Sequence, residues 1–130
     1  MSILVGWTNS DKDTIQCVIQ GSWTWLEMEA ALEQSFMLTE SVTHLVDVIV
    51  DLRHSQPFPD DGLLFFKNAL KVLPENRGNI IIVGGGNSLR SLVSLLKIVS
   101  RSQARRLHTV DSPRQADLLM KQLRQKHAVA

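Results

Sequence analysis

Apolar and polar residues alternate in two short segments at the start of the chain. Residues 3–7 are mostly apolar, residues 8–13 are polar, and residues 14–20 place Ile15, Cys17 and Ile19 between polar neighbours. A period of two residues is typical of a strand with one buried face. The pattern therefore predicts an opening β-hairpin.

Four later segments carry the helical period, in which apolar residues recur every three or four positions. Thr24 and Glu27 have the spacing of a capping box, and Ser112, Pro113 and Gln115 supply an N-cap, a first-turn proline and its capping partner. The expected helices run from Thr24 to about Ser41, from Asp60 and Asp61 to Pro74, from Asn87 or Ser88 to about Ser100, and from Ser112 to near Lys126.

Three further strands are expected at residues 42–52, 79–83 and 106–110. The first of them is rich in β-branched residues with few polar interruptions, which is typical of a central strand covered on both faces. The element order is ββαβαβαβα, a hairpin followed by strands joined through helices. This order predicts an α/β fold with a mixed, mainly parallel sheet of about five strands and about four helices.

Length and composition indicate one ordinary globular domain, residues 1–130. The chain is 44% apolar and 21% charged, which excludes a disordered protein. Its net charge of +1 provides no global field toward nucleic acid or an anionic membrane. Cations gather locally at Arg101, Arg105 and Arg106 and again at Lys121, Arg124 and Lys126. The favoured interpretation of both groups is a solvated rim.

Cys17 is the lone cysteine, so no internal disulfide can form, and no Cys/His group has the spacing of a zinc site. A packed structural thiol is the favoured role for Cys17. The amino terminus lacks the pattern of a signal peptide, and no apolar run is long enough for a membrane span. We expect a cytoplasmic protein without a metal or cofactor.

Three tryptophans, Trp7, Trp23 and Trp25, lie near the opening hairpin and the first helix. Core residues are the favoured interpretation. An exposed pair would instead indicate a homodimer or partner surface.

The turn Gly84, Gly85, Gly86, followed by Asn87 and Ser88, could present backbone N–H groups to an anion at a helix start. It lacks the Gly-Lys-Ser/Thr end of a P-loop, and Leu89 stands where a dinucleotide motif needs its third glycine. A tight strand-to-helix turn is therefore favoured over a nucleotide site.

Asp51 ends the expected central strand, as in aspartyl-phosphate receivers, but the required acidic pair and lysine are missing. Asp51, Asp60 and Asp61 with His54 could also suggest a hydrolytic or metal site. Adjacent acids at a helix start have an ordinary role, because they cap free N–H groups and suit the helix dipole. We assign no catalytic residue and expect no enzyme.

The region from Asp51 to Leu63 resembles the STAS family, the anti-anti-sigma factor fold that also forms the cytoplasmic domain of sulfate transporters. Asp51-Leu52 matches the family's strand end, and Pro59-Asp60-Asp61-Gly62-Leu63 follows at the interval where the family has Asp-Ser-Ser/Thr-Gly-Leu. The strand Ile-Ile-Ile-Val-Gly and the later Leu-His-Thr-Val-Asp-Ser-Pro-Arg-Gln-Ala are also similar to family motifs. The resemblance covers nearly the whole chain.

The resemblance implies a non-enzymatic, regulatory protein-interaction domain whose partner is a signalling protein such as an anti-sigma kinase. In regulatory members that kinase phosphorylates the Ser/Thr before the glycine, and Asp61 occupies this position here. Phosphorylation at the usual position is therefore not expected, while Ser55 stays open as a substitute acceptor. The implied docking loop comprises Asp51, His54, Ser55, Pro59, Asp60, Asp61 and Gly62. The alternative is a module that binds a nucleotide, lipid or other anion near residues 84–88 and 57–61.

Overall fold

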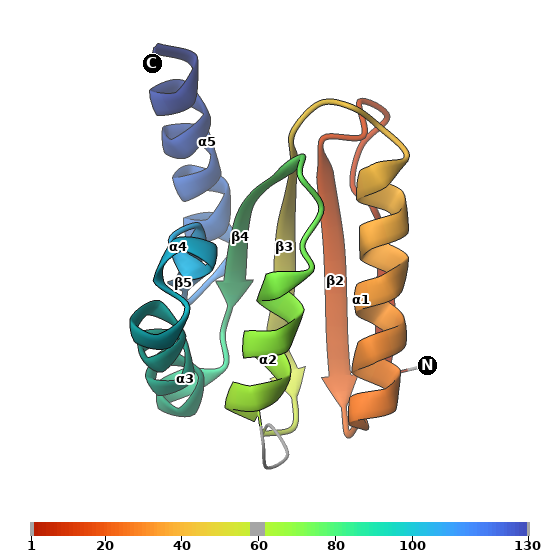
Figure 1. The fold of residues 1–130 in the computed structure, drawn as a ribbon, viewed down its shortest axis with the longest axis vertical. Helices are drawn as coiled ribbons and strands as arrows, with labels where there is room; N and C mark the ends of the chain where they lie inside the picture. Colours follow the sequence, from red (N-terminus) through yellow and green to blue (C-terminus); the bar gives the residue numbers. More distant parts are fainter. Residues whose placement is uncertain (1, 58–61, 130) are drawn as a thin grey trace.

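Five strands form one mixed sheet in which spatial order follows chain order (Figure 1). The computed structural model describes residues 2–57 and 62–129. Strand β1 (Ile3–Trp7) is antiparallel to β2 (Thr14–Gly21), and β3 (Val46–Ser55), β4 (Arg77–Val83) and β5 (Leu107–Val110) follow in parallel. The α/β class, the opening hairpin and the central place of β3 are confirmed.

Helices cover the two faces of the sheet unequally. The helices are α1 (Trp25–Glu40), α2 (Gly62–Lys71), α3 (Gly86–Val99), the short α4 (Arg101–Ala104) and α5 (Pro113–Val129). Each crossover helix joins strands that are neighbours in one direction across the sheet, and crossovers share one hand, so α1, α2 and α3 belong on one face. Figure 1 shows α1 and α2 in front of the sheet.

The main core lies between these crossover helices and the sheet. It combines Ile19 and Leu52 of the strands with Met28 of α1, Leu70 of α2 and Leu89 of α3. A smaller core on the opposite face joins β4 to α5, with its buried members Ile81, Val83, Ala116 and Met120.

Asp47 attaches α5 to the centre of the sheet. Its buried carboxylate accepts hydrogen bonds from the Asn79 backbone N–H at 2.7 Å and from Arg124 Nε at 3.0 Å. Gly78 permits this arrangement, because a Cβ there would overlap Asp47 Oδ1. A buried charge of this kind is tolerated because it is paired and hydrogen-bonded.

Several expected boundaries were wrong. Strand β3 begins at Val46 and continues to Ser55, because Gln20 and Gly21 at the end of β2 pair with His54 and Ser55. Part of the expected docking loop is therefore strand.

Helix α3 begins at Gly86 with Gly85 as its N-cap, so the expected caps Asn87 and Ser88 are wrong. The four-residue α4 was not expected.

Two expected helix caps are present. Thr24 forms the full capping box with Glu27 at the start of α1. Ser112 Oγ accepts the Gln115 backbone N–H at 3.2 Å, while the Gln115 side chain accepts from Asp111 N rather than from Ser112. These local side-chain bonds fix where both helices begin.

Candidate ligand cavity and strand-end surface

Asp51 is a structural anchor at the end of β3. Its carboxylate accepts hydrogen bonds from Arg53 Nε at 3.0 Å, Arg53 NH2 at 2.9 Å and the Arg53 backbone N–H at 3.1 Å. The bonds from the Arg53 side chain are the main reason why the pKa of Asp51 lies below its usual value, against an opposing effect of burial. The ionised acid is held by its own strand, so it is poorly placed to act as a general acid or a ligand.

Ser55 is committed to the fold as well. Its hydroxyl accepts the indole N–H of Trp23 at 2.8 Å and donates to the Gln56 carbonyl at 2.8 Å. His54, beside it, is exposed to solvent. Of the described docking-loop residues, His54 presents an exposed side chain, whereas Asp51 and Ser55 are engaged internally. Arg53, which was not among the predicted residues, is also exposed.

Aromatic side chains join the start of α1 to the start of α2. Trp25 stacks on Phe65 with a centroid distance of 4.5 Å, and Trp23 meets Trp25 edge to face at 5.1 Å. Trp23 is buried and Trp25 is half-buried, as expected for core residues rather than an exposed pair. A Cβ on Gly62 would be 3.7 Å from the Trp25 ring, so the first residue of α2 lies against this cluster.

The remaining loop residues, Pro59, Asp60 and Asp61, lie outside the described residues. Asp61, which the STAS resemblance equates with the phosphoacceptor, is thus known from the sequence alone. Gly62, which follows it, is the first residue of α2 in the described part of the chain, and this helix ends at Lys71 rather than at Pro74 as expected.

The glycine turn before α3 is a strand-to-helix connection. Gly84, Gly85 and Gly86 have φ values of 85°, 89° and 65°, which favour glycine. Gly84 N–H donates to the Val110 carbonyl at 2.9 Å. Leu89 packs closely on Gly85, so a Cβ added at Gly85 would lie only 2.8 Å from the Leu89 Cβ. Asn87 and Ser88 are exposed in the first turn. The turn geometry and the packing of Leu89 explain why glycine stands at these positions, and no bound anion is needed to explain them.

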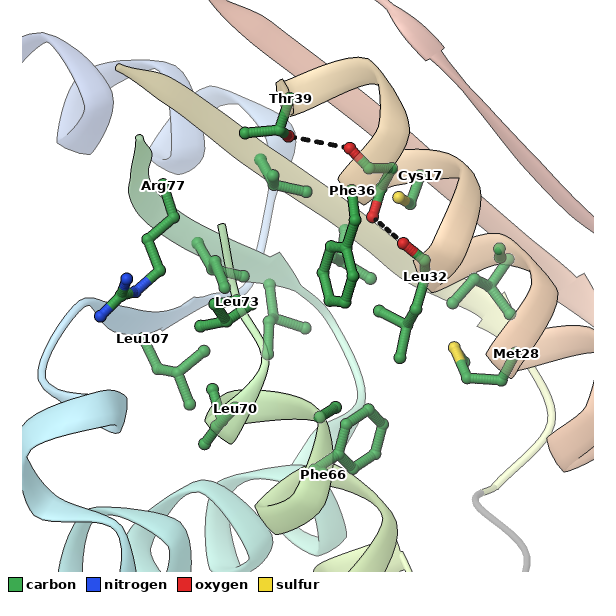
Figure 2. Close-up of a pocket in the computed structure, with 18 of the residues that line it drawn as sticks. Cys17, Met28, Leu32, Phe36, Thr39, Phe66, Leu70, Leu73, Arg77 and Leu107 are labelled. Carbon is green, nitrogen blue, oxygen red and sulfur yellow. Dashed lines mark hydrogen bonds between the residues drawn. The ribbon is translucent and has the colours of Figure 1, made fainter. Parts of the chain in front are cut away.

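A partly open cavity of about 130 Å³ lies in the main core. In Figure 2, Met28, Leu32 and Phe36 of α1 stand on one side of it, and Phe66 and Leu70 of α2, with Leu73 just after this helix, stand on the other. Val48, Val50 and Ile80 of the sheet also line the space. The cavity thus lies between the first two crossover helices and the sheet.

The hydroxyl groups of the lining are used within the protein, and Arg77, which also lines the cavity, donates from Nη1 to the Pro74 carbonyl at 3.1 Å. Ser35 Oγ donates to the Leu32 carbonyl and Thr39 Oγ1 donates to the Ser35 carbonyl, both at 2.8 Å (Figure 2). Burial raises the pKa of the Cys17 thiol to about 12, so this lining residue is a neutral, apolar thiol. In the described chain, every buried side-chain nitrogen or oxygen has a hydrogen-bond partner.

The sequence did not indicate this cavity. Its lining residues have the pattern of ordinary core positions, and the alternative small-ligand hypothesis placed a nucleotide, lipid or other anion elsewhere, near residues 84–88 and 57–61. A cavity reflects how side-chain volumes fit together across helices, which periodicity does not report. Small residues on the facing helices, Ala31 and Ala69, are the nearest signal in the sequence.

Metal and membrane features are limited in the described part of the chain. It contains no group of three or more His, Cys, Asp or Glu side chains arranged to hold a metal ion. Among its helices, none combines the length and apolarity needed to cross a membrane.

Comparison with known proteins found no matching family model and no significantly similar curated protein. The structure therefore carries the functional reasoning that follows.

Proposed function

We propose that this protein is a non-enzymatic, STAS-like binding domain whose internal cavity takes a small apolar ligand. The observation that carries the proposal is a cavity of about 130 Å³ with an almost entirely apolar lining. This refines the small-ligand alternative considered from the sequence, because the binding place is the core rather than the glycine turn.

Leaving this cavity empty is costly. Residual cavities lower stability by about 24 cal/mol per Å³, which gives about 3 kcal/mol for this volume. A domain of this size has a total stability of about 5–15 kcal/mol. A ligand that fills the space restores dispersion contacts along the lining and offsets much of this penalty.

The lining also defines the ligand's chemistry. Because the Ser35 and Thr39 hydroxyls donate to backbone carbonyls, a polar ligand group beside α1 would lose its own hydration without compensation. Arg77 lines the cavity at the side away from these hydroxyls (Figure 2), and its Nη1 donates to the Pro74 carbonyl. Apolar cavities of comparable size in other proteins bind benzene. The expected ligand is an aromatic ring or a short alkyl chain, held by shape and by dispersion.

Thermal unfolding with benzene and with short alkanes tests the proposal. A ligand at 100 times its dissociation constant adds about 2.7 kcal/mol to stability. Ala31→Leu should fill the cavity and abolish the ligand-induced shift, because Ala31 is buried and lines it. Ala30→Leu is the matched control, since Ala30 is exposed one position earlier on α1. No stabilisation of the wild type, or equal stabilisation of Ala31→Leu, contradicts apolar binding.

A second candidate is regulatory docking of a signalling protein at the strand-end surface. Exposed Arg53 and His54 favour it, since they end the central strand on the chain segment that leads to α2. The STAS resemblance, a cytoplasmic location and the absence of an enzymatic role belong to this proposal. A pull-down from native extract tests it by comparing the partner retained by wild type, by Asp61→Ser and by Asp61→Lys. Asp117→Lys on α5 is the control. If Asp61→Lys retains the partner as well as wild type does, docking at this position is contradicted.

A further inference from the structure

The outer surface of α3 and α4 exposes aliphatic side chains that the domain core does not use. Ile98 is 75% exposed, Val99 48% and Leu95 46%. Adjacent exposed apolar residues of this kind often mark an interaction site. We call these three residues, together with Arg101 and Arg105, the α3–α4 surface.

This surface lies in a segment that carries only positive charge. Residues 76–110 contain no aspartate or glutamate, and their cations are Arg77, Arg90, Lys97, Arg101, Arg105 and Arg106. Arg90 is neutralised by an ion pair with Asp111. Within the described residues, neither Arg101 nor Arg105 has a carboxylate at ion-pair distance. The net charge of the whole chain hides this local asymmetry.

The aliphatic and basic residues meet in one place. Ile98, Val99, Arg101 and Arg105 line the same shallow, open depression where α3 passes into α4. Long basic side chains that flank exposed aliphatic ones form the arrangement by which peripheral helices enter a bilayer interface. Together these residues combine apolar insertion with attraction to anionic headgroups.

We propose that the α3–α4 surface docks on an anionic lipid bilayer. A shallow open surface suits a bilayer interface better than a partner helix, which requires a groove. Base stacking on RNA or single-stranded DNA is disfavoured, because the chain contains no Phe, Tyr or Trp after Phe66. The proposal is independent of the internal cavity, since the two sites share no residue among those named for each.

Flotation with phosphatidylcholine vesicles, with and without phosphatidylserine, tests the proposal. Each cation at an anionic surface contributes about fivefold to partitioning, so Arg101→Gln with Arg105→Gln should weaken binding about 25-fold. Ile98→Ser should weaken it about tenfold by removing an inserting side chain. Added salt should weaken wild-type binding, because it screens the attraction.

Helix α5 offers matched controls. Lys121→Gln with Lys126→Gln removes the same charge from exposed positions, and Leu118→Ser removes an aliphatic side chain that is 52% exposed. All the substituted side chains are exposed, so thermal unfolding should show every variant folded. Absence of wild-type binding, or equal losses in the α5 controls, overturns the proposal. So does binding to polyglutamate or RNA without binding to vesicles, which would identify a different partner class.

Discussion

The indole N–H of Trp23 donates a hydrogen bond of 2.8 Å to Ser55 Oγ, joining the segment before α1 to the last residue of β3. The Ser55 hydroxyl in turn donates to the Gln56 carbonyl. Both roles of the hydroxyl are thus used in the fold. This opposes the prediction, made from the STAS resemblance, that Ser55 could serve as a substitute phosphoacceptor.

Ser55→Ala should lower the free energy of unfolding by about 1 kcal/mol, because it removes these hydrogen bonds. Urea denaturation measures the loss. Ser22→Ala, at an exposed serine, is the matched control and should stay close to wild type. If the two variants are equally stable, the Trp23–Ser55 bond is unimportant.

Asp51→Asn should destabilise the protein at neutral pH by about 1 kcal/mol, a value discounted for the partial exposure of Arg53. The folded-state pKa of Asp51 is depressed, chiefly by the bonds from the Arg53 side chain. Its contribution is therefore full above the unfolded-state pKa of about 3.9 and is lost as the pH falls through the folded-state pKa.

Urea denaturation from pH 7 to about pH 3 should show wild type and Asp51→Asn converging in stability at the acidic end. Asp111→Asn, in an exposed ion pair with Arg90, should have a much smaller effect at neutral pH. A gap between wild type and Asp51→Asn that does not narrow with acid would contradict the role given to this carboxylate.

Gly78→Ala should cost about 3 kcal/mol, because the added Cβ displaces the Asp47 carboxylate from Asn79 and Arg124. Gly6→Ala is the control in another strand, since its Cβ would meet nothing within 4 Å. In an Asp47→Ala background, Gly78→Ala should cost much less, because the obstructing carboxylate is gone. If Gly78→Ala lowers stability equally in the wild-type and Asp47→Ala backgrounds, the clash with the Asp47 carboxylate is not the cause of the loss.

Cys17 should react very slowly with a thiol reagent in the native protein. Burial raises its pKa from 9.0 to about 12, which lowers the thiolate fraction about a thousandfold at mildly alkaline pH. Labelling should therefore follow opening of the fold, and benzene in the adjoining cavity should slow it further. Labelling as fast as in urea-denatured protein would show that the core around Cys17 is accessible.

Local signals in the sequence predicted much of the fold. The alternation around Cys17 marked the hairpin, and Thr24 with Glu27 fixed the start of α1, because both patterns act between near neighbours. The end of β3 was mispredicted because its last residues depend on pairing with β2, a contact distant in sequence.

The candidate sites depended still more on tertiary packing. Asp51 was recognised as the end of the strand, but its pairing with Arg53 was not. The cavity arises from the spacing of α1 and α2 above the sheet, which no single segment encodes. The α3–α4 surface was visible in the sequence only as a local group of arginines, interpreted as a solvated rim, until the structure showed Ile98 and Val99 exposed beside them.

The sequential strand order has a consequence for how the chain folds. Every pairing joins strands that are consecutive in the chain, so no strand must wait for an element beyond the next strand. This order keeps the closed loops shorter than an order in which strands pair across several intervening elements, which limits the entropy cost of loop closure. During synthesis the hairpin can form first and each later βα unit can add to its exposed edge, leaving β5 and α5 as the last elements to dock.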